Sequence, residues 1–213
     1  MPPVVEQLPL GPIETNCYIV RAERDATEAV VVDPSGDARS IRSQLAQMDT
    51  HCVAILITHG HWDHLLGVAD LAEGTGASVY MAEVERVLLE EPEGFSPVPM
   101  RPYSPDVLLL GDERFDVAGL AFRVHLVPGH SPAHIAYATD GCLFSGDVLF
   151  AGSVGRTDLP GANWETLLES IRSLVAAYPP ETVIYPGHGA VTTLGTELAR
   201  NPFLGELRAE QRS

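Results

Sequence analysis

The sequence predicts an α/β protein built as a four-layer αββα sandwich, with two mixed β-sheets face to face and helices on the outer faces. Two observations favour this fold class: strand patterns come in runs, and amphipathic helices close the runs in each half of the chain. The chain of 213 residues, 45% hydrophobic and 20% charged, is long enough to bury one large core. We therefore expect a single domain spanning residues 1–213.

The first half predicts two strands, a helix and a third strand. Residues 15–21 and 28–33 are rich in β-branched and apolar side chains, which is typical of paired strands. Residues 37–48 repeat apolar side chains at helical spacing. The continuous apolar run of residues 51–58 indicates a buried strand, and it leads directly into a cluster of histidines.

After that cluster, residues 64–76 predict a helix that two glycines end. Residues 77–81 predict a strand and residues 82–91 a second helix. Residues 92–105 hold five prolines and no periodic pattern, so they predict a loop. Such a loop is either a surface connection or the flank of an active site.

Four strand patterns open the second half, at residues 113–119, 120–128, 134–140 and 142–150. Tight turns are expected at residues 118–119 and 140–141, where glycine is the second residue of each pair. Residues 163–178 predict a helix with Asn163 as its N-cap. Residues 181–189 predict a strand that runs into a histidine between two glycines.

Net charge and the N-terminal residues bear on partners and location. The formal net charge of −16 repels phosphate backbones and anionic lipids, so we expect a small-molecule partner and neither nucleic acid nor membrane. The N-terminal stretch lacks the basic and apolar regions of a secretion signal, and no apolar run reaches membrane length. We expect a cytoplasmic protein.

The three cysteines, Cys17, Cys52 and Cys142, are odd in number and widely scattered, and they form no CxxC pair. This pattern disfavours a disulfide framework and a zinc ribbon. We expect buried, reduced thiols.

Three histidines and an aspartate crowd into residues 59–64, directly after a predicted strand. Such crowding is costly without a cation, so the run favours a metal site. His59 and His61 are two apart and can share one ion in an extended turn. Asp63 and His64 lie half a turn further on and could serve a second ion. Imidazole and carboxylate ligands suit zinc, iron or manganese.

Further ligands are available in glycine-containing turns at other strand ends. His130 lies in PGHS, Asp147 in SGD and His188 in PGHG. A carboxylate such as Asp147 can bridge two cations with its two oxygens. Taken singly, His130 or His188 is more readily explained as a solvated or hydrogen-bonded side chain in a turn than as a ligand. The other histidines are expected to pack or to support a ligand: His51, His125 and His134.

Four motifs, in this order, resemble those of the metallo-β-lactamase-fold hydrolases: THGHWDH (58–64), GHSPAH (129–134), FSGD (144–147) and YPGHG (185–189). The resemblance covers nearly the whole chain and is far more specific for the fold than for the substrate. It implies one metal ion on His59, His61 and His130, a second on Asp63, His64 and His188, and Asp147 as the bridge.

Within that superfamily, residues 147–162 and the NPFL stretch at 201–204 resemble the small glyoxalase II-like (hydroxyacylglutathione hydrolase-like) enzymes. Two features depart from full glyoxalase II enzymes. Only about 25 residues follow His188, too few for the helical domain that holds much of the glutathione site. Arg156 stands where those enzymes have a lysine, so it is either a substrate contact or an ion-pair partner of Asp158.

The resemblance implies a thioesterase: two divalent ions, zinc or else iron or manganese, with a metal-bound hydroxide that attacks an acyl-thiol ester. Hydroxyacylglutathione or a similar thiol adduct would be the substrate. Asp63 would hold the hydroxide in line with the carbonyl carbon, and the ions would stabilise the oxyanion and the departing thiolate.

Three alternatives remain open. Persulfide dioxygenases share the HxHxDH run but use one iron on two histidines and an aspartate, and His134 is a hint against that chemistry. A serine hydrolase would use Ser131 in GHSPA, but its elbow needs a following helix, whereas Pro132 and the alternating residues after it predict a turn and a strand. A non-catalytic binding protein would more often have lost ligands. A β-lactamase or nuclease role is disfavoured by the lack of an export signal and by the charge.

Overall fold

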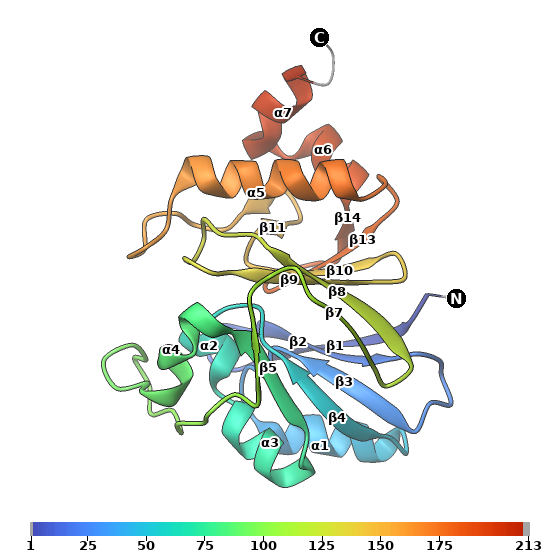
Figure 1. The fold of residues 1–213 in the computed structure, drawn as a ribbon. Coiled ribbons are helices and arrows are strands. Elements are labelled where there is room, and N and C mark those ends of the chain that lie inside the picture. Colours follow the sequence, from blue (N-terminus) through green and yellow to red (C-terminus); the bar gives the residue numbers. More distant parts are fainter. Residues whose placement is uncertain (1, 211–213) are drawn as a thin grey trace.

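Two six-stranded sheets packed face to face form the centre of the protein (Figure 1). The structure is a computed structural model that describes residues 2–210. The first sheet has the order β1-β2-β3-β4-β5-β6, with β1 Val4–Leu10, β2 Thr15–Arg21, β3 Glu28–Val32, β4 His51–Leu56, β5 Ser78–Ala82 and β6 Val107–Leu109. Its first three strands pair antiparallel, and the β3-β4, β4-β5 and β5-β6 pairs are parallel.

The second sheet comes from the second half of the chain. Its order is β14-β13-β10-β9-β8-β7, with β7 Arg114–Val117, β8 Leu120–Leu126, β9 Ile135–Thr139, β10 Cys142–Gly146, β13 Val183–Pro186 and β14 Thr192–Thr193. Only the β10-β13 pair is parallel, so this sheet is mixed as well. A short hairpin of β11 (Leu149–Phe150) and β12 (Ser153–Val154) follows β10.

Helices cover both outer faces, which completes the four predicted layers. In Figure 1, α1 (Ala38–Gln47) and α3 (Val68–Thr75) lie below the first sheet, and α5 (Trp164–Ala177) lies above the second. The shorter helical segments are α2 Trp62–Leu65, the 3-10 turn η1 Glu83–Glu85, α4 Val87–Glu90, α6 Leu194–Arg200, the 3-10 turn η2 Pro202–Leu204 and α7 Gly205–Glu210. The prediction of an αββα sandwich with mixed sheets is confirmed.

Three apolar clusters hold the layers together. Tyr18, Phe122 and Phe144 are buried between the two sheets. Separate clusters join the first sheet to α1 and α3, and the second sheet to α5. Full burial of each large apolar side chain contributes about 1.5–3 kcal/mol. The sheets are therefore a rigid base for the loops at their ends.

The predicted helix over residues 64–76 is wrong as a single element, because the helix is interrupted at Leu66 and Gly67. The amide of Gly67 donates to the carbonyl oxygen of Pro34 at 2.7 Å, and a Cβ at this position would lie 2.6 Å from that oxygen. Only glycine permits such an approach. The interruption separates α2, which carries Asp63 and His64, from α3.

The predicted strand over residues 142–150 also ends early, at Gly146. Gly146 has a φ of +48°, and a Cβ there would lie 2.5 Å from Thr58 Oγ1 and 2.7 Å from His134 Nε2. The backbone turn at this residue directs the chain into the next loop, which begins with Asp147. The other predicted turns, at residues 118–119 and 140–141, are confirmed by positive φ at all four residues.

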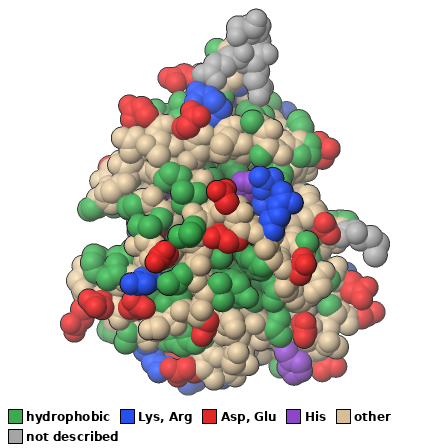
Figure 2. Space-filling view, in the orientation of Figure 1, with side chains coloured by type: hydrophobic (Ala, Val, Ile, Leu, Met, Phe, Trp, Pro, Cys, Tyr) green, Lys and Arg blue, Asp and Glu red, His purple; other side chains and the backbone are tan. Residues whose placement is uncertain are grey.

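Figure 2 shows acidic side chains spread over one face of the molecule, in keeping with the net charge of −16. Within residues 2–210, no helix has both the length and the apolar character needed to span a membrane.

Candidate metal centre

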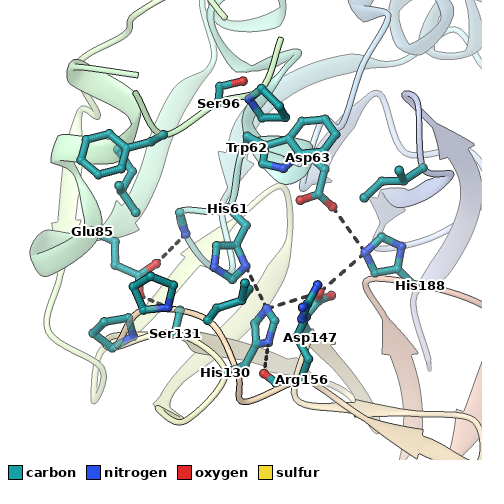
Figure 3. Close-up of a pocket in the computed structure, with 18 of the residues that line it drawn as sticks. His61, Trp62, Asp63, Glu85, Ser96, His130, Ser131, Asp147, Arg156 and His188 are labelled. Atoms are coloured by element: carbon teal, nitrogen blue, oxygen red, sulfur yellow. Dashed lines mark hydrogen bonds and ion pairs between the residues drawn. The ribbon is translucent and has the colours of Figure 1, made fainter. Parts of the chain in front are cut away.

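Seven side chains from the segments that follow four strands meet in one place. Figure 3 shows five of them around the pocket: His61, Asp63, His130, Asp147 and His188. Those that follow β4 are His59, His61, Asp63 and His64, and those that follow β8, β10 and β13 are His130, Asp147 and His188 respectively. Every residue that the sequence predicted as a metal ligand is in this group. Tertiary structure brings His130 and His188 to the run at residues 59–64, although each was ambiguous alone.

The first set of donors is three imidazoles. Nδ1 of His61 lies 3.0 Å from Nε2 of His59 and 2.9 Å from Nε2 of His130. A proton on His61 Nδ1 could donate to only one of these two nitrogens, so a hydrogen bond accounts for only one of the two short contacts. Nitrogens bound tetrahedrally at about 2.1 Å from one zinc ion would lie about 3.4 Å apart, close to this spacing. The three rings are therefore arranged to share a cation.

The second set combines imidazole and carboxylate. Oδ2 of Asp63 lies 3.3 Å from Nε2 of His64 and 3.3 Å from Nε2 of His188. His64 is fully buried, whereas the His188 side chain is 30% exposed at the edge of the site. Nitrogen and oxygen donors of this kind suit zinc, iron and manganese.

Asp147 lies between the two sets. Its Oδ2 is 3.5 Å from Nε2 of His130 and 3.6 Å from Nε2 of His188, and its Oδ1 is 3.4 Å from Nε2 of His64. Because the site is crowded, donor atoms of His59, His64 and Asp147 also lie within 4.8 Å of one another. The carboxylate therefore reaches donors of both sets.

Two buried atoms in this centre support a fit to metal ions. Among the described residues, His64 Nε2 and Asp147 Oδ1 have no hydrogen-bond partner. Buried polar atoms without a partner are rare and costly. A divalent cation would engage both, so the donor set fits the metal ions that the sequence implied.

The outer ring nitrogens are held in the orientation that ligation needs. His130 Nδ1 bonds the carbonyl oxygen of Arg156 at 2.9 Å, so it carries the proton and Nε2 keeps its lone pair. His64 Nδ1 bonds Asp33 at 2.9 Å with the same consequence. Partners of this kind fix the tautomer of metal-binding histidines.

The pKa values of the histidines shift in opposite directions in the two sets of donors. Burial, followed by the neighbouring histidines, holds the pKa of His59 well below its usual value, and burial with His130 lowers the pKa of His61 to about 4. Both imidazoles are therefore neutral near pH 7. Burial works against ionisation of Asp63, but hydrogen bonding from His188 and the charge of His64 outweigh it and lower its pKa to about 2.

The two histidines of the second set, His64 and His188, have raised pKa values, in contrast to the lowered values of His59 and His61. Burial opposes protonation of His64, but the carboxylates of Asp33 and Asp147 outweigh it and raise its pKa well above the usual value. The pKa of His188 is raised in the same manner, against burial, by Asp63 and Asp147. In the absence of a cation, protons on these rings balance the carboxylates.

Asp33 is a functional residue that the sequence reasoning missed. Its carboxylate accepts from Thr58 N at 2.8 Å and Thr58 Oγ1 at 2.7 Å, in addition to His64. Asp33 is buried and has a φ of +48°, a left-handed conformation that non-glycine residues seldom adopt. The signal in the sequence was an aspartate at the end of an aliphatic strand, next to a proline.

Strand β2 of the first sheet supports the loop that carries His188. Thr15 Oγ1 donates to Asp63 Oδ2 at 2.7 Å. Asn16 Nδ2 and the Tyr18 hydroxyl both donate to the carbonyl oxygen of Pro186, at 2.9 and 2.6 Å. These bonds join the two sheets at the site, and hydrophobic patterning alone could not have revealed them.

Glu85 was also missed. It is buried, and it joins the two loops that carry the first set of histidines (Figure 3). Its Oε2 accepts from the amide of Gly60 at 2.5 Å. Its Oε1 accepts from the Ser131 hydroxyl at 2.6 Å and the amide of Ala133 at 2.8 Å. The carboxylate therefore fixes the distance between the His59–His61 loop and the His130 loop.

The same contacts bear on the serine alternative. The Ser131 hydroxyl is buried and donates to Glu85, and among the described residues no hydrogen bond joins it to an imidazole that could act as base. Strand β9 begins at Ile135, so no helix follows the serine, as the sequence predicted. His134 accepts from the amide of Asp147 at 3.0 Å and stacks on His59, so it supports the ligands as expected.

Arg156 lines the cleft in front of the centre, and its guanidinium forms a two-point ion pair with Asp158, at 2.6 and 2.7 Å. Both side chains are exposed. The structural role that the sequence suggested for Arg156 is thus present, while substrate contact stays a prediction.

The cleft has a volume of about 1140 Å³ and opens onto His61, Asp63, His130, Asp147 and His188. Gly94 to Pro97 of the proline-rich loop form part of its wall. The loop at residues 92–105 is therefore an active-site flank as well as a surface connection.

Comparisons with known proteins agree with this geometry. Residues 10–188 match the family model of the metallo-beta-lactamase superfamily. The hydroxyacylglutathione hydrolase GloC of Haemophilus influenzae is 31% identical, and the alignment covers 94% of this chain and 97% of the relative.

The crystal structure of BLEG-1 B3 metallo-beta-lactamase is similar with a TM-score of 0.89 and 38% identity, covering 95% of this chain and 100% of the other. TTHA1623, solved in a di-iron-bound form, gives a TM-score of 0.71 and 36% identity, covering 96% and 100%. The chain belongs to the metallo-β-lactamase superfamily.

Proposed function

We propose that the protein is a glyoxalase II-like hydrolase that uses two divalent metal ions to cleave an acyl-thiol ester. The observation that carries the proposal is the centre itself, where two sets of three donors face each other across Asp147 at the end of an open cleft. The relative named as a hydroxyacylglutathione hydrolase supports the choice of a thioester.

We assign His59, His61 and His130 to one ion, Asp63, His64 and His188 to the other, and Asp147 to both. Such ions activate a water molecule and polarise the carbonyl group of a bound substrate. Zinc is the metal we propose. Iron is the first alternative, since a similar protein has been solved in a di-iron-bound form.

Asp63 is the residue we propose to orient the attacking water. It lines the cleft, and Thr15 holds its Oδ2 in place. With a pKa of about 2, it is ionised at neutral pH and can accept a hydrogen bond from the water. The leaving group needs no separate acid, because a thiol has a pKa of about 8.5 and departs readily as thiolate.

The substrate we propose is a small molecule that the cleft can enclose, and we propose the cytoplasm as the location. Arg156, at the rim of the cleft, would contact the substrate if its pair with Asp158 opens. The net charge of −16 supports the expectation of no nucleic-acid or membrane partner.

The test combines metal analysis with hydrolysis rates on thioesters of several thiols, for the purified protein and for His61→Ala. We expect about two ions per chain, thioester hydrolysis, and a loss of at least about 100-fold in His61→Ala, which removes one ligand of the first ion. His51→Ala is the control, because His51 is exposed at the start of β4 and lies outside the centre.

Full thioesterase activity in folded His61→Ala would contradict the proposal. Oxygen uptake with glutathione persulfide by a protein with one iron per chain would instead support the dioxygenase alternative. A β-lactam belongs in the substrate panel, because BLEG-1 bears the name of a β-lactamase. Hydrolysis of the β-lactam alone would replace the thioester as substrate.

A further inference from the structure

The wall of the cleft is apolar almost everywhere except at the metal centre. Apolar side chains reach it from the turn before β2, from η1 and α4, from the proline-rich loop, from the β11-β12 hairpin and from residues 159–160. Because these segments are distant in sequence, the apolar wall forms only when the chain folds and does not come from one hydrophobic loop.

Several of these side chains are open to solvent. Ile13 is 50% exposed, Val84 68%, Val87 42% and Phe95 58%. Hydrophobic side chains gather on the left of Figure 2, on the side where α4 lies in Figure 1. Contiguous exposed apolar surface beside a reactive centre is typical of a binding site for an apolar group.

The charges in the described lining are already engaged. Asp63 and Asp147 belong to the proposed metal centre. Both oxygens of Glu85 accept hydrogen bonds from the protein. Arg156, the one cationic side chain among the described lining residues outside the histidines, is paired with Asp158. No charged group is left free to recognise polar substituents at the apolar wall.

We propose that the enzyme is selective for thioesters with an apolar acyl group larger than acetyl, and not for small hydroxyacyl groups. The inference rests on the proposed thioesterase function. It assigns the apolar wall to the acyl part, because the common thiol carriers are themselves charged and burying them against an apolar wall would be costly.

The test uses thioesters of one neutral thiol, N-acetylcysteamine, so that only the acyl group varies. Each methylene buried against the wall should raise kcat/KM by up to about fourfold, the equivalent of about 0.8 kcal/mol. From acetyl to hexanoyl we expect a gain of at least about 30-fold.

A matched pair isolates polarity from size. The lactoyl and 2-methylpropanoyl groups have the same branching and differ by a hydroxyl in place of a methyl. After division by their rates with hydroxide in solution, we expect the 2-methylpropanoyl ester to be favoured by about tenfold or more, from the burial of a methyl and the cost of desolvating a hydroxyl.

Variants locate the effect. Val84→Ser combined with Phe95→Ser should lower kcat/KM for the hexanoyl ester about tenfold more than kcat/KM for the acetyl ester. Leu110→Ser, at another exposed apolar side chain outside the cleft, should change neither.

A flat dependence on chain length, or preference for the lactoyl ester, would overturn this inference and leave the thioesterase proposal standing. If the protein hydrolyses no ester of this series and no thioester of any other thiol, the thioesterase proposal itself is overturned.

Discussion

The two sets of donors in the candidate metal centre differ in charge and in what supports them. The first set is three imidazoles, and burial keeps His59 and His61 neutral. The second set includes the ionised Asp63, and Asp33 adds a further carboxylate behind His64. Cations are attracted to negative charge in a buried site, so we expect the second set to bind its ion more tightly.

Support differs as well. Glu85 ties the two loops of the first set together through Gly60, Ser131 and Ala133. The second set is held by Asp33 on one side and by Thr15 on the other. The difference teaches that one centre has two halves with different main supports, which meet at Asp147 and at Thr58, whose hydroxyl donates to Asp33 and lies 3.1 Å from His59 Nδ1.

The largest expected effect comes from the shared residue. Asp147→Asn removes the negative charge between both halves, so we expect metal content to fall below two ions per chain and activity to fall by about 10³-fold, which corresponds to several kcal/mol of transition-state stabilisation. Metal analysis and thioester hydrolysis measure both. Asp116→Asn, an exposed aspartate on β7 outside the donor sets and the cleft, serves as control, and equal loss there would argue against a special role for Asp147.

The next effect separates the halves. In Asp33→Asn, an amide nitrogen that accepts no hydrogen bond replaces one carboxylate oxygen, so the donors of Thr58 and His64 can no longer all be accepted and His64 loses its fixed orientation. We expect metal affinity at the second set to fall about 10- to 100-fold, and affinity at the first set to fall less, because Asp33 reaches His59 only through Thr58. Metal titration against a competing chelator resolves the two, with the exposed Asp116→Asn as control. Equal weakening of both sites would contradict this difference in support.

A smaller effect on metal affinity is expected from a change at Glu85, which supports the first set of donors. Glu85→Gln leaves at least one buried donor of the two loops unpaired, which costs about 1–3 kcal/mol of stability. The same change should weaken metal binding at the first set and spare the second, whereas a merely structural role would affect neither selectively. Thermal unfolding of the metal-free protein and the same titration provide the readouts. Glu83→Gln, in the same turn but exposed, should behave like the unmodified protein.

The smallest effect concerns the rim of the cleft. Arg156→Ala removes an exposed cation, so KM for an anionic thioester should rise by up to about fivefold, with kcat unchanged. Steady-state kinetics at low salt, where screening is weakest, measures the change. Arg114→Ala, on β7 and outside the cleft, controls for net charge. An unchanged KM would limit Arg156 to its ion pair with Asp158.

Much of the fold could be predicted because burial patterns are local. Strands β2, β3 and β4 and helices α1 and α5 lie where their apolar periodicity indicated. The short elements could not: β1, β6 and β14 are strands because a neighbouring strand pairs with them, and their own sequences carry little signal. The break at Gly67 likewise depends on the carbonyl oxygen of Pro34, more than thirty residues earlier in the chain.

The sequence by itself determined the donors. Imidazoles and a carboxylate crowded at residues 59–64 are costly without a cation, and this cost is a local property of the chain. Tertiary structure decided which distant residues join them, and it supplied Asp33, Thr15 and Glu85, whose roles are hydrogen bonds between separate segments. It also decided the apolar wall of the cleft, because convergence of side chains from remote loops follows from packing of the two sheets and leaves no period in the sequence.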